Sequence, residues 1–384
     1  MNARLTGTPQ LNRMVNRRLI LERIRRSGKT SRAELAESTA IRPPTVSAIV
    51  KELIDEGLVS EVGNGQSRGG RLPRMLSLSL QKTRTIGFEV SETAILGGVC
   101  DLTGTLIAQT GADFLPNTPQ NTVDRLAKMG EELLAAAGLT WKDISGVGVA
   151  LPGHMDPARG VVRWSKPLGW KDVPLRRMCE LRWGHPTDVV NDSMAGGMAS
   201  HFLGMGRDIK NLVYMYLRFN VIEAHSDDTV HGVLGMGSGI IVNGEPYHGE
   251  FGAAGEITTL VSHPLVDARA ETGEAFHDLG AFVEAVKDGQ PSALAAMDRV
   301  ARDMSDLIVH AVNFLEPGML ILGSDNSELR DALLVRLRRV LDEHRLRHEA
   351  GKTKIVASEL GEYGVVRGAV VPALQRVFRM PRWA

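Results

Sequence analysis

The sequence predicts a winged helix-turn-helix domain followed by a two-lobed α/β body, and three observations support this fold class. Basic residues gather in the first 85 residues, two strand patterns flank a glycine-rich turn there, and strand and helix patterns alternate from Thr85 onward. At 384 residues the chain has room for two or three domains. We place the head at 1–82 and two lobes at 83–200 and 201–384, with the C-terminal helix packing back on the first lobe.

The composition narrows the class of protein. A hydrophobic content of 43% with 23% charged residues is ordinary for a globular protein in water. No apolar run approaches the roughly 20 residues that span a bilayer, and the N-terminus lacks the apolar segment of a signal peptide. Two cysteines, Cys100 and Cys179, are too few for a disulfide framework or a cysteine-based zinc site. We therefore expect a cytoplasmic protein that does not engage a membrane.

The charge is unevenly distributed along the chain. The formal net charge is zero, yet residues 1–85 hold 16 Lys and Arg against 7 Asp and Glu, while the remainder holds 29 against 38. A basic head on an acidic body suggests that only the head meets a polyanion.

Three helices are predicted in the head. The first runs from Leu11 to Arg26, and a capping box formed by Ser31 and Glu34 starts the second, which ends near Ser38. After a tight break over residues 39–42, Pro43 suits the first turn of the third helix. Spacings of three and four residues give this helix one buried stripe, made of Val46, Ile49, Val50 and Leu53.

The opposite face of the third helix is suited to a DNA groove. Its side chains are short, so the backbone can approach base edges closely, and hydroxyl and methyl groups there can contact bases. Basic side chains on and near the helix are better placed for phosphates, which position a protein without reading sequence. The predicted base-side residues are Pro44, Thr45, Ser47 and Ala48, and the predicted phosphate contacts are Arg32, Arg42 and Lys51.

A wing is predicted next, with strands at 58–62 and 75–80 around the turn GNGQSRGGRLP. Its glycines would let Arg68 and Arg71 lie in an A·T-rich minor groove. A helical protein-interaction module with a solvated charged face is the alternative for the head. The combination of capping box, turn, short-chain helix, wing and charge favours double-stranded DNA as the partner.

In the body, three strands are predicted over 84–110, followed by a helix at 123–139 and a buried strand that ends in ALPG. A strand and a helix meet at Asn191-Asp192, where a carboxylate is more often a helix cap than a catalytic base. The second half repeats this pattern, with a glycine turn at GMGSG, a hairpin, a long helix ending near Phe314, a strand at MLILGS and a closing helix. A cleft between two such lobes is a natural ligand site.

Three segments together resemble the ROK family of repressors and sugar kinases, over roughly residues 10 to 380. They are GVGVALPGHMDPARGVVRWSKPLGW, VVNDSMAG and LGMGSGIIVNGEPYHGEFGAAGEI. The resemblance implies an actin-like, RNase H-like ATPase-type fold with the DNA-binding head of the family's repressors. It also implies that Asp192 stands where family kinases have their catalytic base. Asn191 and Glu256 match residues that bind sugar hydroxyls, and Gly153 and Gly169 lie in loops that shape the sugar pocket.

Departures from the kinase pattern argue against ATP chemistry. The family's Asp-x-Gly-Gly-Thr phosphate loop is replaced by residues 89–93, in which Glu92 would place a carboxylate beside a triphosphate. A Gly-Thr pair is replaced by Val233-Leu234, and the adenosine-side Gly-Gly by Gly323-Ser324. We therefore predict that the chain is not an enzyme and carries no cofactor.

The family's zinc site is also missing from the sequence. Its histidine is replaced by Thr259, no cysteine cluster follows, and His263 alone cannot make a tetrahedral site, so no metal is predicted. Residues 220–232 resemble an insertion with acidic and histidine side chains. A solvated loop is favoured there over a metal site, and whether it binds anything stays open. The residues concerned are Glu223, His225, Asp227, Asp228 and His231.

These observations favour a sequence-specific transcriptional regulator of the repressor type, with a sugar or sugar derivative in the interlobe cleft as its effector. It would act as a homo-oligomer, either a dimer or a tetramer, because DNA half-sites are spaced by the helical repeat. The alternatives are a sugar kinase that also binds DNA, a regulator that has lost ligand sensing, and a structural protein with an incidental basic head. The sequence does not fix the effector, the operator or the sign of regulation.

Overall fold

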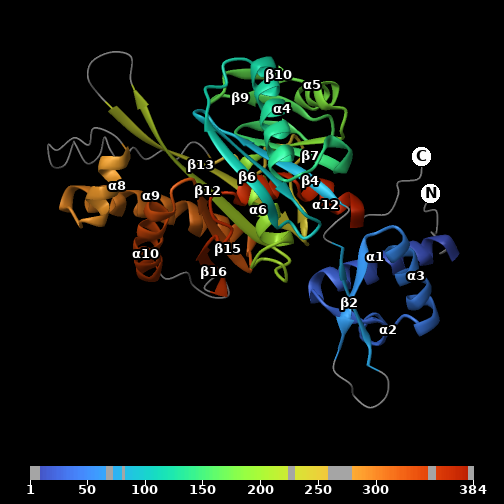
Figure 1. Cartoon of the computed structure of the whole chain (residues 1–384). Coiled ribbons are helices and arrows are strands. Elements are labelled where there is room, and N and C mark those ends of the chain that lie inside the picture. Colours follow the sequence, from blue (N-terminus) through green and yellow to red (C-terminus); the bar gives the residue numbers. More distant parts are fainter. Residues whose placement is uncertain are drawn as a thin grey trace, which may run out of the picture.

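The computed structural model describes residues 9–65, 72–79, 83–223, 230–257, 279–344 and 352–378. The side chains of residues 220–223, 230–234 and 343–344 are not described. The predicted wing arginines, Arg68 and Arg71, and the tip of the 220–232 segment lie outside the described residues, as do Thr259 and His263. Figure 1 shows the head beside a body built around two sheets.

The head contains three helices and a three-stranded sheet of order β1-β3-β2. Its elements are α1 (Pro9–Ser27), β1 (Thr30–Ser31), α2 (Arg32–Thr39), α3 (Pro43–Asp55), β2 (Val59–Asn64) and β3 (Arg74–Leu78). The stripe predicted for the third helix is buried, with 0–1% of each residue exposed at Val46, Ile49, Val50 and Leu53. Helix α1 adds Ile20, Leu21 and Ile24 to this apolar centre of the head, which is continuous with buried residues of the body.

The predicted capping box is present at the start of α2. The Glu34 amide donates to Ser31 Oγ (3.3 Å), and the Ser31 amide donates to Glu34 Oε2 (2.8 Å). The helix ends at Ala40, whose φ of 55° puts it in the left-handed region and turns the chain toward α3. These two ends set the angle between α2 and α3.

Removing the capping hydroxyl should weaken the head. Ser31→Ala leaves the Glu34 amide without its acceptor, so we expect the head to lose about 1 kcal/mol of unfolding free energy. Amide hydrogen exchange across α2 would measure the loss. Ser38→Ala, near the other end of the same helix, is the matched control, because Ser38 Oγ makes only a 3.5 Å contact with a backbone carbonyl. Equal effects of the two substitutions would contradict the capping role.

The first sheet of the body has the order β11-β7-β4-β5-β6, in which β4, β5 and β6 are antiparallel and β7 and β11 run parallel to β4. Helices α4 and α5 cover its outer face (Figure 1). Its elements are β4 (Arg84–Val90), β5 (Ala94–Cys100), β6 (Leu106–Asp113), α4 (Pro119–Ala136), a short 3₁₀ turn (Trp141–Asp143), β7 (Ile144–Leu151), α5 (Leu175–Trp183) and β11 (Thr187–Asn191). A small sheet of order β10-β9-β8 follows β7, built from β8 (His154–Asp156), β9 (Val161–Ser165) and β10 (Trp170–Val173).

The second sheet repeats the same strand pattern, with the order β14-β13-β12-β15-β16. Strand β12 pairs antiparallel with β13 and parallel with β15, as β4 does with β5 and β7. Helices α8, α9 and α10 cover its outer face (Figure 1). Its elements are β12 (Leu212–Glu223), β13 (Val230–Val242), β14 (Glu245–Pro246), α8 (Leu279–Lys287), α9 (Pro291–Leu315), β15 (Met319–Ser324), α10 (Ser327–His344) and β16 (Lys354–Ala357).

Three helices lie between the two sheets: α6 (Asp192–Phe202), α11 (Gly364–Ala369) and α12 (Val371–Phe378). They pack closely because small residues meet there. A Cβ added at Gly368 of α11 would lie 1.9 Å from the Ala195 carbonyl oxygen of α6. Helices α11 and α12 contact strands of the first sheet, while α6 contacts β12 and β13. The domain bounds at residues 82 and 200 stay a prediction.

Three sequence predictions are corrected by the structure. The GMGSG segment, predicted as a turn, lies inside β13, and residues 220–223 and 230–232, predicted as loop, extend β12 and β13. The closing segment contains two helices where one was predicted. The break falls at Val370, two residues before Pro372, whose nitrogen has no hydrogen to donate to the carbonyl four residues earlier.

Among the described helices, none is long and apolar enough to cross a membrane. The described side chains also form no cluster of three or more His, Cys, Asp or Glu arranged to hold a metal ion.

Candidate DNA interface and interlobe site

The predicted DNA face of α3 is on the surface of the head. Pro44, Ser47, Ala48 and Lys51 are exposed, and Thr45 is half-buried. Arg42 is exposed at the start of the helix, where Pro43 and Pro44 occupy the first turn and need no hydrogen-bond acceptor for their nitrogens. The helix thus presents short side chains outward while its apolar stripe faces the head.

Ion pairs hold this helix in place. Arg17 donates to both carboxylate oxygens of Glu56 (2.8 and 2.5 Å), and Arg13 pairs with Glu52, so α1 is fastened to the C-terminal part of α3 and the residue after it. Arg32, predicted to contact phosphate, pairs with Glu61 of the wing strand β2 (3.0 Å). Glu61 also binds Arg74 of β3. Arg32 therefore also links α2 to the wing, and its phosphate contact stays a prediction.

On the ligand side, the structure brings Asn191 and Gly153 together at the end of β11. Asn191 caps α6 by accepting from the Met194 amide (3.0 Å), and its Nδ2 donates to the Gly153 carbonyl (3.0 Å). Gly153 has a φ of 118°, and a Cβ there would lie 2.5 Å from the Trp164 carbonyl oxygen, so this position requires glycine. The helix cap expected at this junction is thus Asn191, and Asp192 is the first helical residue.

The Asp192 carboxylate is buried, and each of its oxygens accepts at least one hydrogen bond from the protein. Its Oδ1 accepts from the Ser193 amide (2.6 Å) and hydroxyl (3.1 Å), and its Oδ2 accepts from Nη2 of Arg218 (3.0 Å). Arg218 lies on β12, so the contact joins α6 to the second sheet. Asp192, which the resemblance predicts to stand at the position of the family's catalytic base, is an ion-pair partner in this chain.

Arg218 also binds the first phosphate-loop segment of the other lobe. Its Nη1 donates to Glu92 Oε2 (3.2 Å) and its Nη2 to Glu89 Oε1 (3.4 Å), while the Tyr216 hydroxyl donates to the same Glu89 oxygen (3.0 Å). Only 7% of the Arg218 side chain is exposed. One buried guanidinium therefore bridges three carboxylates. We call these four residues the Arg218 cluster: Glu89, Glu92, Asp192 and Arg218.

Glu89 is the least satisfied member of the Arg218 cluster. Within the described part of the chain its Oε2 is buried without a hydrogen-bond partner. Burial raises the pKa of its carboxyl to about 7, an effect that Arg218 opposes and Asp192 reinforces. The carboxyl thus titrates near neutral pH inside the fold.

This raised pKa predicts a pH-dependent stability. The folded chain keeps a proton on Glu89 between pH 4.5 and 7 that the unfolded chain releases, so the free energy of unfolding should fall as the pH rises through that window. Compared with Glu89→Gln, the wild type should lose about 3 kcal/mol of unfolding free energy between pH 4.5 and 7, since each pKa unit corresponds to about 1.4 kcal/mol. Denaturant unfolding followed by the fluorescence of the four tryptophans of the first lobe would test this. Parallel pH profiles for both proteins would contradict it.

Glu256 lies close enough to Asp192 for the charges of the two carboxylates to interact. It keeps much of its surface in solvent, yet partial loss of hydration, followed by the charge of Asp192, raises the pKa of its carboxyl, and His154 opposes this. His154 in turn contacts the Phe251 carbonyl through Nε2 (2.7 Å). Asn191, Asp192, Glu256 and Gly153 therefore belong to one region.

Gly169 is the predicted ligand residue that is not brought into this group. It lies in the turn between β9 and β10, where its amide donates to the Lys166 carbonyl (3.2 Å). No hydrogen bond in the described portions of the chain links it to Asn191 or Asp192. Its role in a sugar pocket stays a prediction.

Sequence reasoning missed Arg218 and the two tyrosines that precede it on the same face of β12. Side chains alternate between the two faces of β12. One face, toward α6 and the first lobe, carries Tyr214, Tyr216 and Arg218. The other face, toward helices α8, α9 and α10, carries Val213, Met215 and Leu217. The sequence did offer a signal for this residue, because the arginine falls on the same strand face as two aromatic residues expected to be buried. A buried arginine requires acidic partners, so the pattern indicates an internal ion pair.

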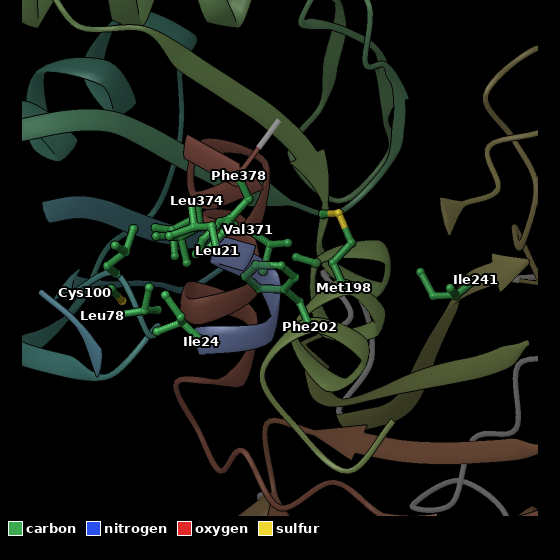
Figure 2. Close-up of a cluster of buried hydrophobic side chains, with 14 of the residues drawn as sticks. Leu21, Ile24, Leu78, Cys100, Met198, Phe202, Ile241, Val371, Leu374 and Phe378 are labelled. Carbon is green, nitrogen blue, oxygen red and sulfur yellow. The ribbon is translucent and has the colours of Figure 1, made fainter. Parts of the chain in front are cut away.

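The head is attached to the body through α1, α6 and α12. Figure 2 shows Leu21 and Ile24 of the head in one apolar cluster with Phe202, Leu374 and Phe378 of the body. Arg25 of α1 is stacked over the Phe202 ring, 3.9 Å from its centroid, and its Nη1 donates to the Phe202 carbonyl (2.6 Å). Since α6 begins at Asp192 and ends at Phe202, one helix contacts the candidate ligand region and the head.

Comparison with known proteins identifies the family. The ROK family profile matches residues 85–258 and 257–376, which together make up more than half of the chain. The chain belongs to the ROK family. A winged helix-turn-helix DNA-binding profile also matches residues 15–60 of this ROK protein, the segment that holds α2 and α3.

Relatives of this ROK protein carry the names of regulators. The xylose repressor of Caldicellulosiruptor bescii is 25% identical over 413 residues, which cover 98% of this chain and all 100% of the relative. The DNA-binding transcriptional dual regulator NagC of Escherichia coli strain K12 is 21% identical, with 95% of each chain covered. Both relatives therefore match this ROK protein along head and body together.

Solved structures of ROK proteins share the fold. A ROK family transcriptional regulator described as a homolog of the E. coli MLC protein has a TM-score of 0.74 at 20% identity, over 94% of this chain and 96% of that one. A ROK glucokinase from Streptomyces griseus in complex with glucose and AMPPNP has a TM-score of 0.63 at 20% identity, over 76% of this chain and 99% of the kinase. The predicted fold class, a two-lobed ROK body behind a winged helix-turn-helix head, is confirmed.

Proposed function

We propose that this ROK protein is a sequence-specific transcriptional regulator of the repressor type, whose binding to an operator changes when a sugar binds between its lobes. The observation that carries the proposal is the path through α6, which begins at Asn191 and Asp192 and ends at the Phe202 contact with Arg25 of the head. A ligand that moves the start of this helix also moves a surface to which the DNA-binding domain is fixed. The names of the relatives, which include a xylose repressor and NagC, support the same function.

The sugar is assigned to the region around Asp192 by chemistry. Carboxylates and amides accept and donate the hydrogen bonds that adjacent sugar hydroxyls require, and Asn191, Asp192 and Glu256 supply both groups. A ligand switches the protein only if it binds one lobe arrangement more tightly than the other. The two heads of a homo-oligomer would then change their spacing, and DNA half-sites tolerate little change in spacing. A regulator of this kind acts on chromosomal DNA, so the proposal includes a cytoplasmic location.

We also infer that kinase activity has been lost. A catalytic base must accept a proton from the sugar hydroxyl, but protonation of Asp192 would neutralise its buried ion pair with Arg218 (3.0 Å). Glu89 and Glu92 add negative charge next to this position, whereas phosphoryl transfer needs the charge of a triphosphate to be neutralised.

A sugar kinase that also binds DNA is the second candidate, favoured by the shared fold of the glucose-bound ROK glucokinase. Purified full-length protein incubated with ATP, magnesium and a panel of glucose, xylose and N-acetylglucosamine would decide between the two. Sugar-dependent ADP release that is lost in Asp192→Asn would establish the kinase. Release no faster than without sugar supports the regulator.

The experiment that tests the proposed function directly is an affinity selection of genomic DNA fragments with full-length protein at near-physiological salt. A regulator should enrich a few sites with two-fold symmetric halves, and the genes beside them would nominate the sugar. Even enrichment across all fragments would show a head that binds polyanions without reading sequence, and the proposal would fail.

A further inference from the structure

The Arg218 cluster joins the two lobes of the body directly, and we propose that it is a proton-sensitive latch between them. The lobes stay joined while Glu89 carries a proton, and they separate more readily once Glu89 is ionised. Such a latch responds to pH alone. It therefore adds an input that the proposed function does not include, and its operation needs neither a sugar nor DNA.

The latch is built from strands of opposite lobes. Glu89 lies near the end of β4, Glu92 follows in the turn after that strand, and Arg218 lies on β12 of the second lobe. Arg218 donates to Glu92 Oε2 (3.2 Å) and to Glu89 Oε1 (3.4 Å), and the Tyr216 hydroxyl donates to the same Glu89 oxygen (3.0 Å). These three hydrogen bonds run from one lobe to the other, so they break when one lobe rotates away from the other.

The Glu89 carboxyl is poorly placed to carry a charge while the lobes are joined. The residue is 4% exposed, and its Oε2 lacks a hydrogen-bond partner within the described residues. Its nearest cation, Arg218, is shared with Asp192 at 3.0 Å and Glu92 at 3.2 Å. Separation of the lobes would bring water to this carboxyl, and water stabilises the ionised form. The joined arrangement therefore favours the protonated carboxyl, and the separated one favours the carboxylate.

Several charged and titratable groups face Glu89. They are Tyr214, Tyr216 and Arg218 of β12, Asp192 of α6, Glu92 after β4 and Asp325 after β15. Burial raises the pKa of both tyrosines, so these stay neutral, while Asp192 and Asp325 oppose a further negative charge at Glu89. The neighbouring strands β5 and β7 contain no charged residue. Arg367, the charged residue of α11, donates to the Gly104 carbonyl instead (2.9 Å).

The direction of the response follows from the proton balance. Burial raises the pKa of Glu89 to about 7 in the joined lobes, whereas a hydrated glutamate in separated lobes returns to its ordinary value of 4.5. The contact is then strongest below pH 4.5, weakens as the pH rises toward 7, and changes no further above that. Within this window each pH unit raises the ratio of separated to joined lobes about tenfold.

Single-molecule fluorescence energy transfer in the full-length protein measures lobe separation directly. Dyes on Lys128→Cys of α4 and Val335→Cys of α10 label one exposed position on each lobe, and the two native cysteines are buried. An excess of unlabelled protein leaves one labelled chain in each oligomer. From pH 5.5 to 7.5 we expect the ratio of separated to joined lobes to rise at least about tenfold. A constant ratio overturns the latch, and so does a rise accompanied by loss of helical circular dichroism, which would indicate unfolding.

Substitutions test whether Glu89 is the group that responds. Glu89→Gln cannot titrate, so its ratio should be the same at both pH values. Glu131→Gln makes the same change on the exposed face of α4 and should respond as the wild type does. Equal responses in the wild type and Glu89→Gln would overturn the proposal.

Tyr216→Phe gives a second test that keeps the Glu89 carboxyl in place. The Tyr216 hydroxyl favours the ionised form of Glu89, so its removal should raise the pKa of Glu89 further and extend the response to higher pH. This variant decides the outcome if Glu89→Gln does not fold. A response that ends at the same pH as in the wild type would show that another group carries the proton.

Discussion

Ala48→Glu should abolish specific DNA binding, with a loss of at least about 100-fold in affinity for a fragment recovered from the genomic selection. Ala48 is exposed on α3 between Ser47 and the buried Ile49, on the face predicted to enter the groove. A glutamate there keeps the helix but places a longer, negatively charged side chain where base edges and phosphates must approach. A hundredfold loss corresponds to about 3 kcal/mol, the cost of one or two good base contacts.

Fluorescence anisotropy with a labelled fragment would measure this, together with the salt dependence of binding. Ala135→Glu is the matched control, because Ala135 is also an exposed alanine on a helix, α4, and the substitution adds the same charge. It should bind DNA as the wild type does. If both variants retain full affinity, α3 is not the recognition helix and the head must use another surface.

Much of the head could be predicted because its signals are local. The capping box at Ser31, the proline at the start of α3 and the spacing of Val46, Ile49, Val50 and Leu53 each involve residues a few positions apart. Local hydrogen bonds and the helical period are sufficient to fix such elements. The alternation of strand and helix patterns likewise predicted two similar lobes, although it did not predict the order of the strands in either sheet.

The wrong turn at GMGSG has a specific physical reason. Glycines between apolar segments usually mark turns, but Gly237 and Gly239 lie in β13 where α6 crosses it. A Cβ at Gly239 would lie 2.3 Å from the Ser193 carbonyl oxygen, and one at Gly237 would lie 2.3 Å from Ser193 Oγ. These glycines serve a close contact between a helix and a strand, which depends on residues more than forty positions away.

The acidic partners of Arg218 could not be identified from the sequence for the same reason. Arg218 is separated by 126 residues from Glu92 and by 26 from Asp192, and the two carboxylates belong to different elements. The sequence did predict that the Glu92 carboxylate would repel a triphosphate. The arginine that pairs with Glu92, however, comes from the other lobe. Only the fold brings the two segments together.

The second large effect is expected where the head meets the body. Arg25→Met should leave operator binding without sugar intact, but reduce the change in operator affinity caused by a bound sugar by at least about tenfold. The substitution removes the stacking of the guanidinium on the Phe202 ring and the 2.6 Å hydrogen bond to the Phe202 carbonyl. It keeps an apolar side chain of similar length in the cluster with Leu374 and Phe378.

The reasoning depends on α6 as a rigid connection. The helix has 11 residues, and at about 1.5 Å per residue it spans roughly 16 Å from Asp192 to Phe202. Its packing against α11 leaves no room for a Cβ at Gly368, so a shift at its first turn is passed along its length. Arg25 then transfers that shift to α1. Helix α1 is in turn connected to α3 by its ion pairs with Glu52 and Glu56.

Arg26→Met is the matched control for this coupling. Arg26 follows Arg25 on the same helix, but it is exposed and its only ion pair to the body in the described residues is a 3.4 Å contact with Asp208, itself 86% exposed. Exposed pairs of this kind contribute little, so the sugar response should stay near that of the wild type. Operator anisotropy with and without the sugar measures the response, and calorimetry confirms that both variants still bind the sugar. Two outcomes would contradict the coupling: equal losses of sugar response in the two variants, or a full response in Arg25→Met. Either would show that the signal reaches α3 by another route, because the contact of α6 with the head would then not transmit it.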